Sequence, residues 1–148
     1  MKWEIKKFNE LTGQEVYEIL KLRNEVFVVE QQCIYEDCDD KDKKSYHLFG
    51  EENGEIIAYL RILEKGISYN EISIGRVLTD KVHRGKGIAN QMMLNAIDFI
   101  ENNLSEKTIR ISAQQYLLRF YSNLGFVKVS EVYLEDDIPH IEMLYKKF

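Results

Sequence analysis

Residues 74–89 read IGRVLTDKVHRGKGIA, and this stretch decides the fold. Its first six residues are rich in β-branched and other apolar side chains, which predicts a strand. Gly85 and Gly87 then stand in a basic turn, and the apolar residues that follow repeat at helical spacing. Glycines let a backbone approach an anion closely, and the unpaired N–H groups of a first helical turn point at it. This order therefore predicts a phosphate-binding place, with positive charge from Arg84 and Lys86 beside it.

The glycine turn does not fit two familiar nucleotide-binding patterns. No Gly-Lys-Ser/Thr sequence ends it, as a Walker A loop requires, and it lacks the three-glycine spacing of a dinucleotide-binding fold. An ordinary helix entry, in which glycine only relieves backbone strain, stays the alternative at this point.

The remaining elements flank this stretch on both sides. Thr12 and Glu15 have the spacing of a capping box, which predicts the start of a helix that runs towards Val28 and Val29. The order of elements predicts an α/β domain whose mixed sheet is covered by helices. The predicted elements are a strand over 3–6, this helix, strands over 46–49, 56–63 and 71–79, a helix over 89–102, a strand over 109–113, a short helix over 115–123, a strand over 126–132 and a last strand after Pro139.

Length and composition predict a single domain over residues 1–148. The chain has 45% hydrophobic and 30% charged residues, and its one proline and eight scattered glycines leave no linker. The N-terminus lacks the apolar region of a secretory signal, and no apolar run approaches the roughly 20 residues that a bilayer requires. We therefore expect a cytoplasmic protein without a membrane partner. Cys33 and Cys38 are too few for a disulfide framework and make a poor zinc set, so we expect reduced thiols and no metal.

The charge of the chain argues against one class of function and leaves another open. A net charge of −5 argues against sequence-independent binding to nucleic acid, which depends on basic surface. The acidic residues are concentrated in one segment, which can either draw a cationic amine to a nearby cleft or simply face solvent. They are Glu30, Glu36, Asp37, Asp39, Asp40 and Asp42.

Two motifs resemble those of one enzyme family. Arg84, Gly87 and Ala89 form an Arg-x-x-Gly-x-Ala pattern that resembles the pyrophosphate-binding loop of the GNAT N-acetyltransferase superfamily, and FYSNLGF at 120–126 resembles its second motif. The resemblance implies the GNAT fold, a mixed sheet of about six or seven strands that is flanked by helices and splayed where coenzyme A lies. It also implies direct transfer of an acetyl group from acetyl-CoA to an amine, without a covalent acyl-enzyme. GNAT domains often form a homodimer.

The same resemblance assigns the cofactor contacts. It implies that backbone groups of Val77, Leu78 and Thr79 pair with the acetyl-pantetheine arm, and that a backbone N–H near Leu78 stabilises the oxyanion. Gln114 stands where many relatives have an asparagine that contacts this arm. Tyr121 matches the tyrosine that protonates the departing thiolate, against the alternative of a tyrosine that only packs in the core. The implied pyrophosphate contacts are Arg84, Gly85, Lys86, Gly87, Ile88, Ala89 and Asn90.

The resemblance does not identify the general base. Ile109 occupies the position at which some relatives carry a glutamate, and its side chain cannot accept a proton. The residue types leave four candidates: Glu30 or Asp37 through a water, His47 and His140.

A narrower resemblance points to the ElaA-like subgroup. It is based on RNEVFVVEQQC at 23–33 and LEDDIPHIEM at 134–143. This resemblance does not supply the acceptor, and our hypothesis is a small amine or an exposed protein amine. A structural ion pair between Arg23 and Glu30 is the alternative for those two residues. Two alternatives to an enzyme stay open: a GNAT domain that binds acyl-CoA without turnover, and an interaction domain that docks a basic partner. Tyr121 favours the enzyme. The implied acceptor-site residues are Arg23, Gln31, Tyr35, Asp39 and Arg76, together with Glu30, His47 and His140.

Overall fold

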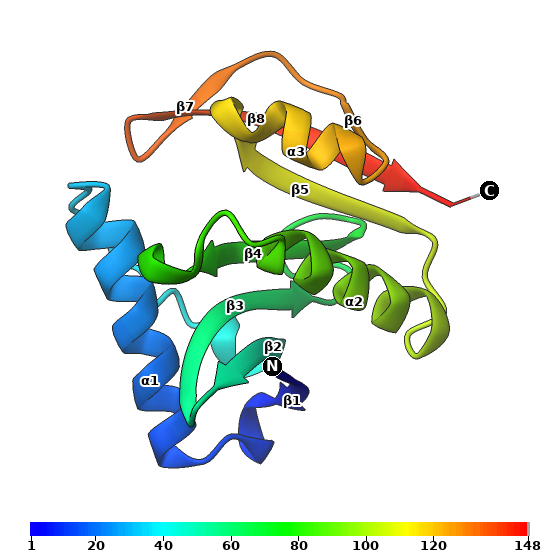
Figure 1. Cartoon of the computed structure of the whole chain (residues 1–148). Helices are drawn as coiled ribbons and strands as arrows, with labels where there is room; N and C mark the ends of the chain where they lie inside the picture. Colours follow the sequence, from blue (N-terminus) through cyan, green and yellow to red (C-terminus); the bar gives the residue numbers. More distant parts are fainter. Residues whose placement is uncertain (148) are drawn as a thin grey trace.

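The computed structural model describes residues 1–147, and its centre is an open sheet of eight strands (Figure 1). The strands stand in the order β1-β2-β3-β4-β5-β8-β6, and β7 pairs with β8. Their bounds are β1 Lys2–Lys7, β2 Ser45–Glu52, β3 Glu55–Leu63, β4 Ile72–Thr79, β5 Thr108–Gln114, β6 Phe126–Lys128, β7 Tyr133–Glu135 and β8 Ile138–Lys146.

The two central strands separate along most of their length. β4 and β5 run parallel but pair only at Ile72 with Ile109 and at Ser73 with Arg110. Beyond these pairs β5 continues against β8, and β4 continues against β3. The edges of β4 and β5 that face each other beyond Ser73 are therefore unpaired. This arrangement confirms the predicted mixed sheet with a splayed centre.

Helices cover both faces of the sheet (Figure 1). Leu48 and Phe49 are neighbours in β2 and point to opposite faces. Leu48 belongs to the larger core, which contains the buried face of α2, and Phe49 belongs to the smaller core, which contains that of α1. None of the helices in residues 1–147 is long and apolar enough to cross a membrane. The helices are α1 Gly13–Arg23, a π-helical segment Asn24–Glu30 that continues it, α2 Ile88–Asn102 and α3 Leu118–Asn123, and short 3₁₀ turns occupy 8–10, 41–44, 81–83 and 115–117.

The start and the end of the first helix have local causes. The N–H of Glu15 donates to Thr12 Oγ1 at 3.1 Å and the N–H of Thr12 donates to Glu15 Oε1 at 2.9 Å, which confirms the capping box. After Arg23 the helix widens, and the N–H of Gln31 donates to the carbonyl of Val26, five residues back, at 3.2 Å. The chain thus stays helical as far as predicted, but the last part is a π-helix.

The predicted strand over 126–132 is wrong in its second half. β6 ends at Lys128 and β7 begins at Tyr133, and both pair with β8. Between them, the N–H of Glu142 in β8 donates to the side-chain hydroxyl of Ser130 at 2.8 Å. A side chain thus takes the place of a backbone partner, and the chain leaves the ladder. This break gives two short strands where one was predicted.

Candidate active site

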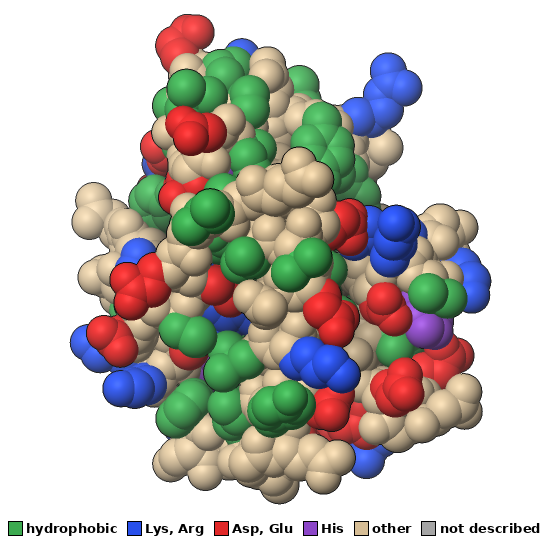
Figure 2. All heavy atoms as spheres, turned by 90° about the vertical axis from the view of Figure 1, so that its left-hand side faces the viewer, with side chains coloured by type: hydrophobic (Ala, Val, Ile, Leu, Met, Phe, Trp, Pro, Cys, Tyr) green, Lys and Arg blue, Asp and Glu red, His purple; other side chains and the backbone are tan. Residues whose placement is uncertain are grey.

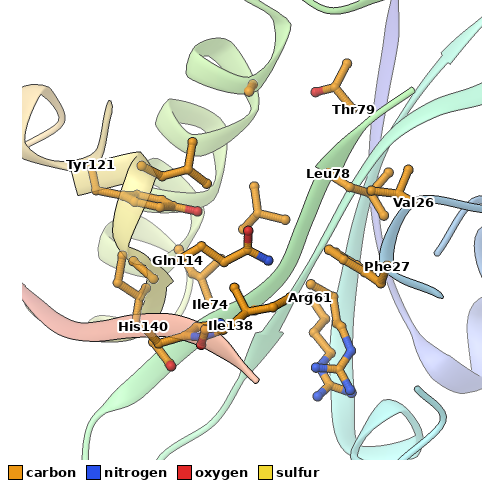
Figure 3. A pocket seen from close by; sticks show the side chains of 18 of the residues that line it. Val26, Phe27, Arg61, Ile74, Leu78, Thr79, Gln114, Tyr121, Ile138 and His140 are labelled. Atoms are coloured by element: carbon orange, nitrogen blue, oxygen red, sulfur yellow. The ribbon is translucent and has the colours of Figure 1, made fainter. Parts of the chain in front are cut away.

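A cleft of about 1180 Å³ opens between the separated ends of β4 and β5 (Figure 3). Its walls come from β4, the glycine turn, α3, the end of β5, the π-helical segment and the start of β8. The β4 wall contains a bulge, because Arg76 and Val77 together stand opposite one residue of β3. Arg76 has a φ of +52°, which is strained for a residue with a side chain. Segments far apart in the sequence thus meet at one irregular strand edge.

The glycine turn forms a backbone cradle at one end of the cleft. Gly85 and Gly87 have φ values of +80° and +76°, and a Cβ built on either of them would meet nothing within 4 Å. Gly87 precedes α2, whose first N–H groups have no intrahelical partner and carry the positive end of the helix dipole. Nearby, Thr79 Oγ1 is buried and has no hydrogen-bond partner among residues 1–147. The turn therefore fits an anionic group, and the Thr79 hydroxyl can bind a further polar atom of the same ligand.

The residues of the cradle do not all face the cleft. Its lining includes Arg84, Gly85, Gly87, Ile88, Ala89 and Asn90, together with Val77, Leu78 and Thr79 of β4, but not Lys86.

Arg84 does not extend freely into the cradle. Its Nη1 and Nη2 donate to the two carboxylate oxygens of Glu30 at 2.7 and 2.9 Å, and its Nε donates to the carbonyl of Thr79 at 2.9 Å. The hydrogen bonds from Arg84 lower the pKa of Glu30, and those to Glu30 raise the pKa of Arg84. This clamp joins the π-helical segment to the glycine turn and holds Glu30 in its ionised form.

Tyr121 stands on the wall opposite β4. Its side chain is 5% exposed, and its ring packs edge-on against Phe120 and Phe126 at centroid distances of 5.0 and 5.9 Å. The hydroxyl points into the cavity (Figure 3). Burial raises the pKa of Tyr121, so the hydroxyl keeps its proton at neutral pH. Such a group is suited to donate a proton.

Two glutamines meet across the cleft. The amide of Gln31, just after the π-helical segment, exchanges two long contacts with the amide of Gln114 at the end of β5, at 3.4 and 3.3 Å. Cys33 Sγ donates to the carbonyl of Asp136 in the β7–β8 turn at 3.4 Å. These contacts connect the two halves of the splayed sheet across the cleft.

His140 faces the same cleft from β8. It stands opposite Gln114 in the sheet and is 7% exposed. Its Nδ1 lies 2.7 Å from the carbonyl of Ile138, which requires a proton on Nδ1 and leaves Nε2 as the acceptor in a neutral ring. Nε2 lies 3.4 Å from Glu135 Oε2, and the ring stacks on Tyr133 at 6.1 Å. The ring is thus held with its free nitrogen available.

His47 and Arg23 do not line this cleft. His47 is 2% exposed, its Nδ1 lies 2.6 Å from the hydroxyl of Tyr59, and its Nε2 lies 2.8 Å from the carbonyl of Asp42. Burial lowers the pKa of His47. Arg23 is fully buried beneath the cleft wall. The proposed ion pair between Arg23 and Glu30 is wrong, because Arg23 binds two aspartates instead.

The acidic segment is largely neutralised by arginines. Arg23 donates to Asp37 at 2.8 Å and to Asp42 at 2.7 Å. Arg61 donates to Asp42 as well, and its two terminal nitrogens bind Asp39 at 2.7 and 2.6 Å. Figure 2, which looks onto the side where the end of α1 approaches the β7–β8 hairpin, shows acidic and basic side chains interspersed. The segment therefore forms neither one strong negative field nor a simple solvent-facing loop.

Three of the predicted acceptor-site residues belong to this network or to its edge and line the cleft. Tyr35 donates its hydroxyl proton to Asp37 at 2.7 Å, and Arg76 pairs with the same carboxylate at 2.9 Å. Asp39, which pairs with Arg61, is the third of these residues. Asp37 itself does not line the cleft.

The sequence of residues 8–147 matches the family model of an acetyltransferase (GNAT) domain. The chain belongs to the GNAT acetyltransferase family. Membership supports acyltransferase activity. The chain is 37% identical over 145 residues to the protein ElaA of Escherichia coli, which covers 97% of this chain and 95% of ElaA. It is 41% identical to a UPF0039 protein of Synechocystis over 97% of this chain and 94% of that one.

Solved structures of the GNAT family agree with the sequence comparison. The crystal structure of E. coli ElaA superposes with a TM-score of 0.92, covering 99% of this chain and 100% of that one. An acyl-CoA N-acyltransferase from Pseudomonas aeruginosa has a TM-score of 0.92 and 39% identity, over 98% of this chain and 99% of that one. The ElaA-like resemblance is thus confirmed along nearly the whole chain.

Some residues of this GNAT cleft were not found from the sequence. Arg61 interrupts a run of otherwise buried residues in β3, and a lone charge in such a run is a signal that it has a buried partner. Phe27 was noted only as part of an apolar helix face. Glu135 gave no signal, because its proximity to His140 depends on the β7–β8 turn.

Proposed function

We propose that this protein transfers an acetyl group from acetyl-CoA to a primary amine by direct attack in a ternary complex. One observation carries the proposal: the unpaired edge of β4 runs from the glycine cradle past Tyr121, and all three line one cleft. An extended ligand can add itself to such an edge as a strand, and its anionic end then reaches the cradle. CoA, with a pantetheine arm and a diphosphate, has this form.

The cradle and β4 hold the cosubstrate in this proposal. The diphosphate lies on the N–H groups of residues 85–90, and the pantetheine arm pairs with the backbone of residues 77–79. Because Arg84 is engaged with Glu30, it shapes the turn rather than binding phosphate. Exposed Lys86 adds charge from outside the cleft. Gln114 lies beside the arm.

The chemistry needs one base, one acid and an oxyanion site. The nitrogen lone pair of a neutral amine attacks the thioester carbonyl, so that a C–N bond forms and the C–S bond then breaks. A backbone N–H near Leu78 stabilises the oxyanion between these events. The proton that nitrogen loses goes to the base, and the thiolate takes a proton from the Tyr121 hydroxyl. Solvent returns the tyrosine to its protonated form.

We assign the base to His140. His140 lines the cleft, and its Nε2 has no contact shorter than the 3.4 Å approach of Glu135. Glu30 is held ionised by Arg84, and both nitrogens of His47 are engaged outside the cleft. The Asp37 carboxylate is occupied by Arg23, Tyr35 and Arg76. Among the four candidates, only His140 offers a free acceptor to the cleft.

The acceptor carries positive charge in this proposal. Three carboxylates on the cleft rim, Glu36, Glu135 and Asp136, make no ion pair with a lysine or arginine of residues 1–147. Their field favours a cationic small amine or a basic protein segment. We also expect action in the cytoplasm without a metal, nucleic acid or membrane, and the homodimer stays a prediction.

The test joins binding and turnover in one sample. Acetyl-CoA is titrated into the protein by calorimetry, and thiol release is then followed with polyamines, amino acids and basic peptides. We expect binding and amine-dependent thiol release. Binding without release from any amine favours a non-catalytic acyl-CoA-binding domain, which Tyr121 and His140 in the same cleft make less attractive. Absence of binding overturns the proposal.

A further inference from the structure

The cleft has an apolar wall on the α1 face of β4. Val26 and Phe27 of the π-helical segment stand there beside Leu78, and all three line the cavity. Val26 and Leu78 are nearly buried in the smaller core, and Phe27 packs against that core at its edge (Figure 3). Leu78 also belongs to the strand edge that receives the thioester in the proposed function. This wall is therefore the nearest apolar surface for the group that the thioester carries.

Several contacts hold the backbone of the π-helical segment around Phe27. Its carbonyls at Val26 and Val28 accept bonds from N–H groups five residues ahead, at 3.2 and 3.0 Å. At its end, Glu30 is clamped by both terminal nitrogens of Arg84. The backbone that carries Phe27 is thus restrained, and its ring is packed against the smaller core.

A charged residue lines the same part of the cleft. Arg61 is 4% exposed, and Asp39 and Asp42 hold its terminal nitrogens (Figure 3). Its Nε has no hydrogen-bond partner among residues 1–147. A longer hydrocarbon chain would have to displace the Phe27 ring or press against this desolvated cation, and both are unfavourable.

We propose that Phe27 sets the length of the transferred acyl group and restricts it to acetyl. The proposal depends on acyl transfer as the function and adds to it the residue that selects the donor. Val26 and Leu78 form the sides of this subsite, and Phe27 forms its end.

The experiment compares acyl-CoA donors in the wild type and in Phe27→Ala. The value of kcat/KM is measured with acetyl-, propionyl- and butyryl-CoA and one fixed amine. Each methylene that becomes buried raises the relative rate by about fourfold, so the ratio of butyryl to acetyl should rise by about 15-fold in the variant. The KM for the amine should stay within about twofold.

Phe99→Ala is the matched control. Phe99 is also a partly buried phenylalanine, but it lies on α2 against Tyr46 and away from the cleft. It should lower the melting temperature and leave the donor ratio unchanged. If Phe27→Ala does not fold, Phe27→Leu is measured instead. In that variant the ratio of kcat/KM for propionyl-CoA to that for acetyl-CoA should rise.

Each other outcome is decisive. An unchanged donor ratio with a raised KM for the amine would place Phe27 in the acceptor site and overturn the proposal, as would an unchanged ratio with no other effect. If the wild type releases no thiol with any of the amines, the proposed function fails separately. Calorimetric affinities for acetyl- and butyryl-CoA in both proteins then decide the role of Phe27.

Discussion

Replacement of Arg23 by methionine should destabilise the protein without acting on the acceptor directly. Arg23 is fully buried, and its loss leaves the carboxylates of Asp37 and Asp42 without their closest partner. Breaking a buried ion pair costs about 3–5 kcal/mol. Here each carboxylate keeps a second arginine, Arg76 for Asp37 and Arg61 for Asp42, both at 2.9 Å. We therefore expect the lower end, about 3 kcal/mol, which is a drop of about 6–12 °C in melting temperature.

The stability lost in Arg23→Met should depend on pH in a defined direction. Burial acts to raise the pKa of Asp42, but hydrogen bonds and charge from Arg23 and Arg61 outweigh it and lower the pKa. A lowered native pKa gives stability that is present above the unfolded value and is lost as the pH falls through the native one. The difference between wild type and Arg23→Met should therefore be full at pH 7 and shrink below about pH 4.

Urea unfolding at both pH values measures this difference. Lys21→Met, an exposed position on the same helix, is the control and should change the free energy of unfolding by less than about 0.5 kcal/mol. A stable Arg23→Met protein with a raised KM for the amine would refute the reasoning and return Arg23 to the acceptor site.

Three further substitutions test the proposed mechanism. Tyr121→Phe should lower kcat by about 100-fold and leave the calorimetric affinity for acetyl-CoA within about twofold, and a weakened affinity would contradict its role as acid. Gly87→Glu should abolish acetyl-CoA binding, whereas Gly87→Ala, which has the same backbone strain without the charge, should keep part of it, and equal losses would argue against a diphosphate cradle. His140→Ala should lose about 100-fold in kcat, and added imidazole should restore part of the rate, which it would not do for a histidine that only packs.

Short-range signals predicted most of the fold. The capping box at Thr12 and the glycine turn at 85–87 each depend on residues within a few positions, so the sequence alone defines them. Helical periodicity located α2 correctly. It did not distinguish hydrogen bonds four residues apart from bonds five residues apart, and the π-helical segment after Arg23 was therefore not predicted.

Long-range pairing limited the prediction of the site. The partners of Arg23 lie 14 and 19 residues away, and Glu30 pairs with Arg84 at a separation of 54 residues. Composition indicates that charges are abundant, but only the folded chain determines which carboxylate meets which arginine. For this reason the sequence left the role of the acidic segment open and gave four candidates for the base.

The arginine network also explains how an irregular segment can form a defined wall of the cleft. Between Gln31 and Asp40 the chain has neither helix nor strand, and the backbone N–H groups of residues 31–33 bond back to the π-helical segment, so the rest depends on side chains. Arg23 from α1 pairs with Asp37 and Arg61 from β3 pairs with Asp39, so this segment is tied to both layers of the N-terminal half. Because these charges balance within the wall, they orient Tyr35 through Asp37 without attracting ions of either sign. The unpaired carboxylates of the rim then select the cationic amine. Shaping the cleft wall and attracting the acceptor are thus done by different residues.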